Sequence, residues 1–339
     1  MCTAITYRTK EHYFGRNLDL EYSYEEQVVI TPRNYVFAFR KAGVLHSHYA
    51  MIGMAYVQDD YPLYYEATNE KGLSMAGLNF PENAYYGEIL PEKDNVAPFE
   101  LIPWILGQCA TIAEVRCLLE NIQIADVAFS EQLPPSPLHW MIADKEAAIT
   151  VEAVKEGLKI YDNTIGVLTN NPTFDYHMMN LNNYMNLSNQ TPLNRFAKDV
   201  QLKEYSRGMG AIGLPGDLSS ASRFVRMAFH KLNSVAETGP KDAGESAEEM
   251  ETASVGQFFH LLDSVAMPTG ALQMPNGLYD KTIYSSCCNT DRGIYYYTTY
   301  ENRQICAVKM WEEDLDGRGL WVYPLQKKQN IMWCKRLHD

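Results

Sequence analysis

The residue best placed to do chemistry in this sequence is Cys2, which follows Met1 at the head of a strand-like stretch, CTAITYRT. If Met1 is removed, Cys2 carries both a thiol and a free α-amine, whose ordinary pKa values are about 8.5 and about 7.7–8.0. Because both groups titrate near neutral pH, one residue could supply a nucleophile and its base. We therefore expect Met1 to be removed and regard Cys2 as a candidate nucleophile. The alternative is an incidental cysteine at a chain end.

Two charged residues are expected to lie beside Cys2. The stretch HYFGRNLDL follows the first strand after a turn at Lys10–Glu11, which predicts a β-hairpin. Facing residues in a hairpin lie about 5 Å apart, so that Arg16 and Asp19 can reach the chain end. Arg16 would favour the thiolate through its positive charge, and Asp19 could accept a hydrogen bond from the amine. Taken alone, these two charges could equally form a surface ion pair.

The composition is that of an ordinary globular protein. The 339 residues include 29 Lys and Arg against 42 Asp and Glu, a net charge of −13. This balance disfavours a protein that binds nucleic acid or an anionic membrane. No secretory signal is visible, and the apolar runs are shorter than the ~20 residues that a membrane helix needs. Seven cysteines without disulfide-like spacing favour a reduced, cytoplasmic protein.

Hydrophobic patterns divide the chain into blocks of strands, helices, strands, helices and strands. Alternation typical of strands fills 2–80, 137–163 and 282–325, whereas helical spacing occurs in 97–122, 219–235 and 255–265. Thr111, followed by Glu114, is a predicted helix N-cap. The polar, acidic stretch 237–253 is interpreted as a surface loop. The order fits one α+β domain over 1–339, with stacked antiparallel sheets and helices on their outer faces.

Two short patterns are not interpreted as sites. Residues 208–213 read G-x-G-x-x-G, but no apolar strand precedes them and no helix follows at once, as a dinucleotide-binding turn requires. His46 and His48 could share one face of a strand, but no third metal ligand is evident nearby. We therefore expect neither a metal nor a cofactor.

Five separated motifs resemble the choloylglycine hydrolase family: MCTAIT…FGRNLDLEYSY, NEKGLSMAGLNFP, PLHWMIAD, GVLTNNPTFDYH…NLNNY and GLPGDLSSASRFVR. That family contains bile salt hydrolases and penicillin V acylases, and it belongs to the N-terminal-nucleophile hydrolases. The resemblance covers essentially the whole chain. It implies a four-layer αββα sandwich, in which two stacked antiparallel sheets are flanked by helices.

The resemblance implies that six residues form the active site: Cys2, Arg16, Asp19, Asn79, Asn170 and Arg223. Cys2 would be the nucleophile and its amine the base. Asn79 and Asn170 would donate hydrogen bonds to the oxyanion, and Arg223 would be a second active-site arginine. We prefer Asn170 to Asn171 because many relatives have T-N-S-P in this motif. By residue type alone, the asparagines would be turn residues.

The implied substrate is a bile salt, in which a steroid acid is joined to glycine or taurine by an amide bond. By similarity, four residues are expected to form an apolar wall for the steroid: Leu18, Tyr24, Phe129 and Leu133. Asn79 favours a bile salt hydrolase, since penicillin V acylases often carry tyrosine there. Penicillin V acylase remains the alternative enzyme, and a non-catalytic thiol or lipid-binding protein of the same fold is the alternative from another class. The resemblance also implies a homotetramer.

Overall fold

The predicted N-terminal hairpin is present. In the computed structural model, which describes residues 1–236 and 246–335, β1 (Cys2–Arg8) pairs antiparallel with β2 (His12–Leu20). The register places Cys2 opposite Leu18 and Ala4 opposite Arg16. Because alternate side chains in a strand point to the same face, Cys2, Arg16 and Leu18 share one face of this pair.

The hairpin belongs to a six-stranded antiparallel sheet with the order β14-β1-β2-β15-β16-β17. The other strands are β14 (Val167–Leu168), β15 (Lys281–Asn289), β16 (Ile294–Thr299) and β17 (Cys306–Lys309). Strands β2 and β15 approach very closely at Gly15, where an added Cβ would lie 2.0 Å from the Ser286 carbonyl oxygen. Only glycine fits this position.

A second antiparallel sheet has eight strands in the order β13-β12-β11-β8-β7-β6-β3-β18. Its strands are β3 (Gln27–Thr31), β6 (Met51–Gln58), β7 (Tyr61–Asn69), β8 (Ser74–Asn79), β11 (Leu138–Ala143), β12 (Ala148–Val154), β13 (Gly157–Asp162) and β18 (Trp321–Pro324). The short strands β4 (Phe37–Ala38) and β5 (Val44–Leu45) pair separately, as do β9 (Asp94–Val96) and β10 (Ile122–Ile124).

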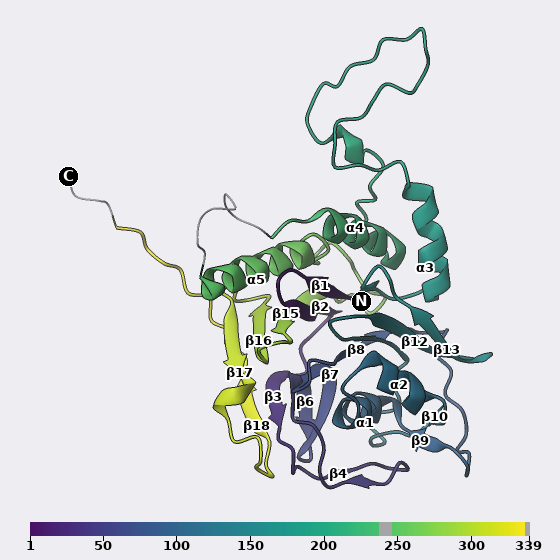
Figure 1. Cartoon of the computed structure of the whole chain (residues 1–339), viewed down its shortest axis with the longest axis vertical. Coiled ribbons are helices and arrows are strands. Elements are labelled where there is room, and N and C mark those ends of the chain that lie inside the picture. Colours follow the sequence, from purple (N-terminus) through teal and green to yellow (C-terminus); the bar gives the residue numbers. More distant parts are fainter. Residues whose placement is uncertain (237–245, 336–339) are drawn as a thin grey trace.

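Helices cover the outer faces of both sheets (Figure 1). Helices α4 (Ser220–Asn233) and α5 (Ala247–Asp263) lie on the six-stranded sheet, with α3 (Phe174–Asn180) beside α4. Helices α1 (Leu101–Gln108) and α2 (Ile112–Leu119) lie on the eight-stranded sheet. The four layers are therefore helix, sheet, sheet, helix, which confirms the predicted αββα sandwich.

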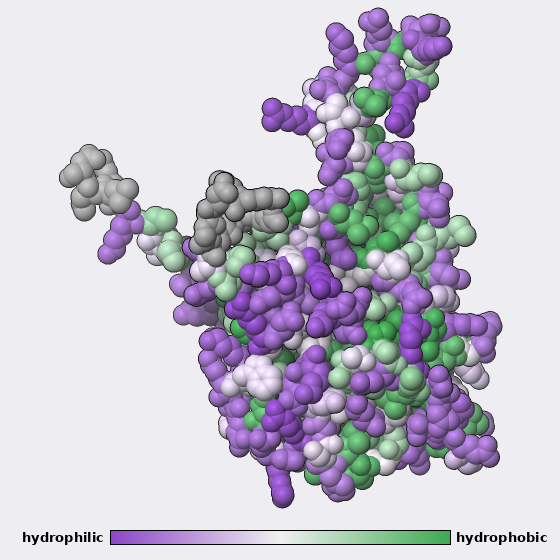
Figure 2. All heavy atoms as spheres, in the orientation of Figure 1, coloured by the Kyte–Doolittle hydropathy of each residue, from purple (hydrophilic) through white to green (hydrophobic). Residues whose placement is uncertain are grey.

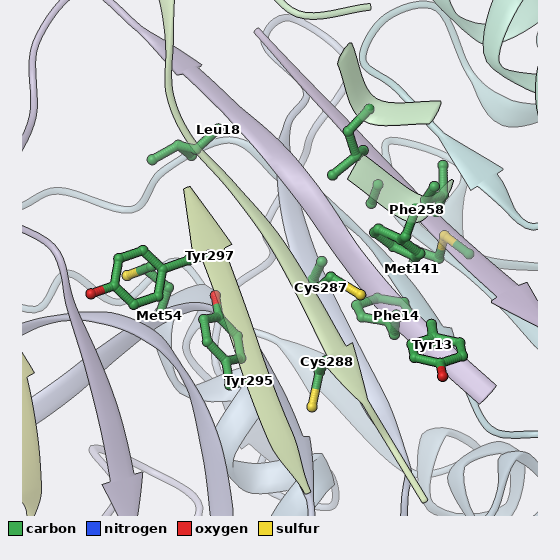
Figure 3. Packing of buried hydrophobic residues seen from close by; sticks show 14 of the residues in the cluster. Tyr13, Phe14, Leu18, Met54, Met141, Phe258, Cys287, Cys288, Tyr295 and Tyr297 are labelled. Atoms are coloured by element: carbon green, nitrogen blue, oxygen red, sulfur yellow. The ribbon is translucent and has the colours of Figure 1, made fainter. Parts of the chain in front are cut away.

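Buried side chains form two cores. The inner core lies among the two sheets, α4 and α5; it contains Cys2, and Figure 3 shows Phe14, Leu18 and Tyr295 within it. The outer core lies between the eight-stranded sheet and α1 and α2, and it includes Leu106. Among the helices of the described residues, none combines the length and apolar character needed to cross a membrane.

One local prediction is confirmed and another is wrong in part. Thr111 caps α2, because its side chain accepts a hydrogen bond from the backbone N–H of Glu114. Residues 247–253 of the predicted surface loop are the first turns of α5, while 237–245 lie outside the described residues. Ser246 and Glu249 form a capping box, which satisfies the free N–H groups at the start of this helix. The acidic residues that suggested a loop therefore favour a helix start.

A projecting arm, residues 189–208, extends from the body between α3 and α4 (Figure 1). Its base is closed by a hydrogen bond of 2.9 Å from the Ser188 N–H to the Gly210 carbonyl oxygen. All of its residues are exposed, and Figure 2 shows apolar side chains among the polar ones. The G-x-G-x-x-G pattern begins where the arm ends and is followed by loop up to α4.

Candidate active site

Cys2 is buried, with 2% of its surface exposed, at the first position of β1. Its backbone N–H donates to Asn170 Oδ1 at 2.8 Å, and its carbonyl oxygen accepts from Arg223 Nη1. The preceding α-ammonium of Met1 donates to the Asp19 carbonyl oxygen at 2.6 Å and to Asp280 Oδ2 at 3.0 Å. The nucleophile candidate is thus held on both sides by residues from distant parts of the chain.

Asn170 connects several of the predicted site residues. Its Oδ1 accepts from Arg223 Nη2 at 2.7 Å in addition to the Cys2 N–H, and its Nδ2 donates to the Asn79 carbonyl oxygen at 2.7 Å. Its own N–H donates to Ser220 Oγ at 2.8 Å, at the start of α4. Because Asn79 ends β8, Asn170 joins the second sheet to the end of β1. The structure therefore places Asn170 against Cys2 and Asn79 against Asn170.

Arg223 reaches the end of β1 from α4 and is fully buried. Besides Cys2 and Asn170, it donates to Thr3 Oγ1 at 2.6 Å and to the Leu218 carbonyl oxygen at 3.0 Å. Burial lowers the pKa of Arg223, while the negative potential of Asp19 and Cys2 opposes this shift. Arg223 therefore contacts the backbone of Cys2 from the helix side of the sheet.

Arg16 approaches from the opposite side, between the two sheets. Its Nη1 donates to the carbonyl oxygens of Gly77 at 2.5 Å and Tyr65 at 3.2 Å. Within the described residues, its buried Nη2 has no hydrogen-bond partner. Burial disfavours the Arg16 cation, but the surrounding negative groups, Cys2 first among them, raise its pKa above the ordinary value. Arg16 thus shares the inner face with the Cys2 side chain, as the register predicts.

Asp19 lies at the chain end, but its contacts differ from the expected one. Its carbonyl oxygen, not its carboxylate, accepts from the Met1 ammonium, and Oδ1 accepts from Thr282 Oγ1 at 2.6 Å. The buried Oδ2 has no partner in the part of the chain that the structure describes. Burial raises the pKa of Asp19, and Arg223 and the terminal ammonium oppose this shift. A hydrogen bond from the Cys2 amine to Asp19 stays a prediction.

Of the four predicted substrate residues, Leu18 lies directly opposite Cys2 and is buried. Tyr24 is exposed on the loop after β2, where its hydroxyl lies 3.1 Å from that of Tyr22. Phe129 and Leu133 share a turn before β11, and the Phe129 ring contacts those of Tyr61 and Phe99 at centroid distances of 5.8 and 5.3 Å. A steroid wall formed by these four residues stays a prediction.

Sequence reasoning missed three residues around the site. Ser220 lies in the SSASRFVR motif, and its place after the Ser219 N-cap was a usable signal. Glu66 is a lone acidic residue within the apolar strand β7, and a charged residue at a buried position is unusual enough to be noticed. Asp280 carries no local signal, because it lies 279 residues from the ammonium that it binds.

Comparisons with known proteins agree with this geometry. Residues 2–323 match the family of linear amide C–N hydrolases, choloylglycine hydrolase family. The chain is 54% identical over 328 residues to a bile salt hydrolase/transferase of Lactiplantibacillus plantarum, covering 97% of this chain and 98% of the relative. A bile salt hydrolase/transferase of Clostridium perfringens is 41% identical over 337 residues, with coverage of 98% and 99%.

Solved structures show the same fold. A mutant of the conjugated bile acid hydrolase from Clostridium perfringens matches with a TM-score of 0.88 at 39% identity, covering 99% of this chain and 100% of the other. A penicillin V acylase from Agrobacterium tumefaciens matches with a TM-score of 0.71 at 20% identity, covering 95% and 90%, and therefore supports the fold alone. This chain belongs to the choloylglycine hydrolase family of linear amide C–N hydrolases.

Proposed function

We propose that this chain is a bile salt hydrolase, which cleaves the amide bond between a bile acid and glycine or taurine. The relatives that it matches at 54% and 41% identity are bile salt hydrolases/transferases, and the family acts on linear amides. The observation that carries the proposal is the setting of Cys2: a buried thiol at a strand end, with its backbone held by Asn170 and Arg223.

The nitrogen of Cys2 would become the catalytic amine. It is 2.8 Å from Asn170 Oδ1, and removal of Met1 would turn this amide nitrogen into an α-amine at the same place. The amine would take the thiol proton, directly or through one water, and leave a thiolate on the same residue. Arg16, on the same face as the thiol, would stabilise the thiolate by its charge.

The reaction then proceeds in two halves. The thiolate attacks the amide carbonyl and forms the S–C bond, while Asn79 and the second hydrogen of Asn170 Nδ2 donate to the oxyanion. The protonated amine gives its proton to the leaving nitrogen, the C–N bond breaks, and glycine or taurine departs. Water next attacks the thioester and passes a proton to the amine. The S–C bond breaks, which releases the free bile acid and restores the thiolate.

A substrate panel tests this assignment. We expect the protein to release glycine from glycocholate and taurine from taurocholate, and to act on penicillin V more slowly. Much faster turnover of penicillin V would overturn the bile salt assignment and leave the amide hydrolase in place. Binding of bile salts without turnover by a protein lacking Met1 would point to a non-catalytic member of the fold. Apolar wall variants, Leu18→Ala and Phe129→Ala, should raise KM for the conjugates more than they lower kcat.

The assembly expected from the resemblance is a homotetramer, and we propose that the projecting arm contributes to it. The arm exposes large apolar side chains, with Phe196 81% and Tyr205 84% exposed, which is costly for a surface that stays in water. Burial against another copy would remove this cost. Light scattering should give four copies for the wild type and fewer for the double variant Phe196→Asp, Tyr205→Asp. A monomeric wild type, or an unchanged variant, would contradict the proposal.

A further inference from the structure

Glu66 is a buried acidic residue that the mechanism above does not use. It lies on β7 and is 2% exposed, with its carboxylate in the space between the two sheets. Three hydroxyl groups donate to it: Tyr284 to Oε2 at 2.7 Å, and Ser286 at 2.9 Å and Tyr295 at 2.5 Å to Oε1. Burial raises the pKa of Glu66, while Arg16 and the three hydroxyl groups act in the opposite direction. Three donors on two oxygens favour a carboxylate that only accepts, which is the ionised form.

The positive partner of this carboxylate is Arg16. The Arg16 Nε lies 3.9 Å from Glu66 Oε2, and both side chains are almost completely buried. At that distance the two groups form an ion pair without a close hydrogen bond. The guanidinium is positioned instead by the carbonyl oxygens of Gly77 and Tyr65, which hold Nη1. Arg16 therefore keeps its place through backbone contacts, while Glu66 supplies the opposite charge.

The inner face links this pair to the nucleophile. Arg16 and Cys2 lie on the same side of the β1–β2 ladder, two pairs apart, and the negative charge of a thiolate at Cys2 is the leading cause that raises the Arg16 pKa. The buried Nη2 of Arg16, which has no partner among residues 1–236 and 246–335, can donate to a thiolate or to a substrate oxygen. A buried cation next to a thiol, with no opposing charge, would stabilise the thiolate strongly.

We propose that Glu66 is a positioning residue for the hydrolysis that acts through Arg16, by offsetting part of the guanidinium charge felt at Cys2. This offset limits how strongly Arg16 stabilises the thiolate, so that the thiolate stays strongly nucleophilic. A thiolate of much lower pKa attacks more weakly, because nucleophilicity falls with basicity. The inference rests on the proposed thiol mechanism and adds a residue to it.

Other charged and titratable groups also lie near this pair. Around Glu66 these are Arg16 on β2, Tyr65 on β7, Tyr284 and Cys288 on β15, and Tyr295 on β16. Around Cys2 they are Arg16, Arg223, Asp19, Asp280 and the terminal ammonium. Glu66 is the acidic residue that forms an ion pair with Arg16 in the described part of the chain.

The experiment compares the pH dependence of Cys2 alkylation in the wild type and in Glu66→Gln. Iodoacetamide labelling is followed by mass on the N-terminal peptide, which separates Cys2 from the other six cysteines. Because glutamine has no charge, Arg16 is no longer offset, and we expect the alkylation midpoint to fall by about 0.5 pH unit or more. The pH profile of kcat/KM should move in the same direction. An unchanged or raised midpoint would overturn the proposal.

Matched variants separate the charge from a general loss of structure. Ser286→Ala removes one hydrogen bond to Glu66 but keeps the carboxylate, so its midpoint should stay within about 0.2 unit of the wild type. Glu66→Asp keeps the charge, so its midpoint should lie close to that of the wild type. If Ser286→Ala moved the midpoint as far as Glu66→Gln, loosened packing would explain the effect and the proposal would fail.

Two further arms keep the result interpretable. If Glu66→Gln does not fold, Tyr284→Phe replaces it: this change removes the hydroxyl that donates to Oε2, whereas in Ser286→Ala the other oxygen, Oε1, keeps the hydroxyl of Tyr295. Tyr284→Phe should therefore lower the midpoint by less than Glu66→Gln but by more than Ser286→Ala, and no shift would contradict the proposal. Alkylation needs no substrate, so it also separates this inference from the substrate assignment. A wild type that fails to hydrolyse bile salts but shows the expected midpoints would retain the Glu66 role and lose the bile salt proposal.

Discussion

The outer core and the inner core both bury polar side chains, but these side chains serve different groups. In the outer core, Glu100 accepts from the backbone N–H groups of Arg40 at 2.6 Å and Ala97 at 3.2 Å. At the other end of α1, the side chain of Asn69 donates to two carbonyl oxygens, those of Leu106 and Cys109, both at 2.7 Å. Buried polarity there satisfies the free backbone groups at and beside the helix ends.

In and around the inner core, buried charges face one another and are not fully paired. Within the described residues, the buried charged side chains with an unpartnered atom are Arg16, Asp19, Glu152 and Asp280. The first two and Asp280 lie around Cys2, and Glu152 binds His139, which in turn donates to the carbonyl oxygen just before Asn170. Unpaired buried charge is costly for stability and is typical of functional sites. We therefore expect the inner core to carry the chemistry and the outer core to contribute mainly stability.

The largest expected effect is that of Cys2→Ser, which tests whether the inner core acts through its thiol. A serine hydroxyl does not ionise near neutral pH, so kcat for bile salt hydrolysis should fall by at least about 10³-fold. The midpoint of thermal unfolding should change by only a few degrees. The control, Cys117→Ser, changes an exposed cysteine and should leave turnover intact. Substantial turnover by Cys2→Ser would show that the inner core does not act through its thiol.

Neighbouring asparagines give the next test. Asn170→Ala should lower kcat by about 10²–10³-fold, because it removes a proposed oxyanion donor. Asn171, whose side chain donates to the Pro81 carbonyl oxygen at the surface, is the matched control, and Asn171→Ala should change kcat by less than about 3-fold. Steady-state kinetics on glycocholate measures both. If kcat fell equally in the two variants, or fell further in Asn171→Ala, Asn170 would not be the oxyanion donor.

A substitution in the outer core should give the opposite pattern. Leu106 is fully buried against the eight-stranded sheet, and Leu106→Ala should lower the free energy of unfolding by about 2–5 kcal/mol. At a temperature where the variant stays folded, kcat should remain within about 3-fold of the wild type. Chemical denaturation and kinetics on the same sample check both values, with the exposed Leu90→Ala as control. A large loss of kcat would show that the two cores are coupled.

The smallest effect concerns acid stability. Burial lowers the pKa of His177 to about 4, while its Nε2–H donates to the Asn170 carbonyl oxygen. The folded state keeps this histidine neutral, whereas the unfolded chain binds a proton below about pH 6.5, so stability is lost as pH falls from about 6.5 to about 4. This loss amounts to at most about 3 kcal/mol for one residue.

Replacing the histidine should remove that acid sensitivity. His177→Gln should show a smaller decrease in the free energy of unfolding between about pH 7 and about pH 5 than the wild type does. The exposed His46→Gln should leave the decrease unchanged. Urea denaturation at the two pH values provides the measurement. If the free energy of unfolding decreased equally in the wild type and in His177→Gln, other groups would cause the loss of stability at low pH.

Much of the fold was predictable because its signals are local. Alternation and turn residues predicted the hairpin of β1 and β2, and the order of strand and helix blocks agrees with four layers. The site residues Asn79, Asn170 and Arg223 came from motif resemblance, since each alone is an ordinary turn or helix residue. The structure brings them to Cys2 through hydrogen bonds that no spacing in the sequence reveals.

The contacts that could not be predicted join separate sheets or distant strands. Arg16 and Glu66 are 50 positions apart on different sheets, so their pairing depends on how the sheets stack. Asp280 meets the Met1 ammonium only because β15 begins beside the end of β2. The start of α5 was missed for another reason: its acidic first turn has the composition of a loop, and the capping box of Ser246 and Glu249 outweighs this composition.

The most direct test of the account is to trap the acyl-enzyme. The protein is mixed with glycocholate, quenched in acid within one turnover, and digested for mass analysis of the N-terminal peptide. We predict a cholyl thioester on Cys2 in a chain that lacks Met1, and no such adduct in Cys2→Ser. A cholyl group on another residue, or turnover by a chain that retains Met1, would contradict an N-terminal cysteine as both nucleophile and base.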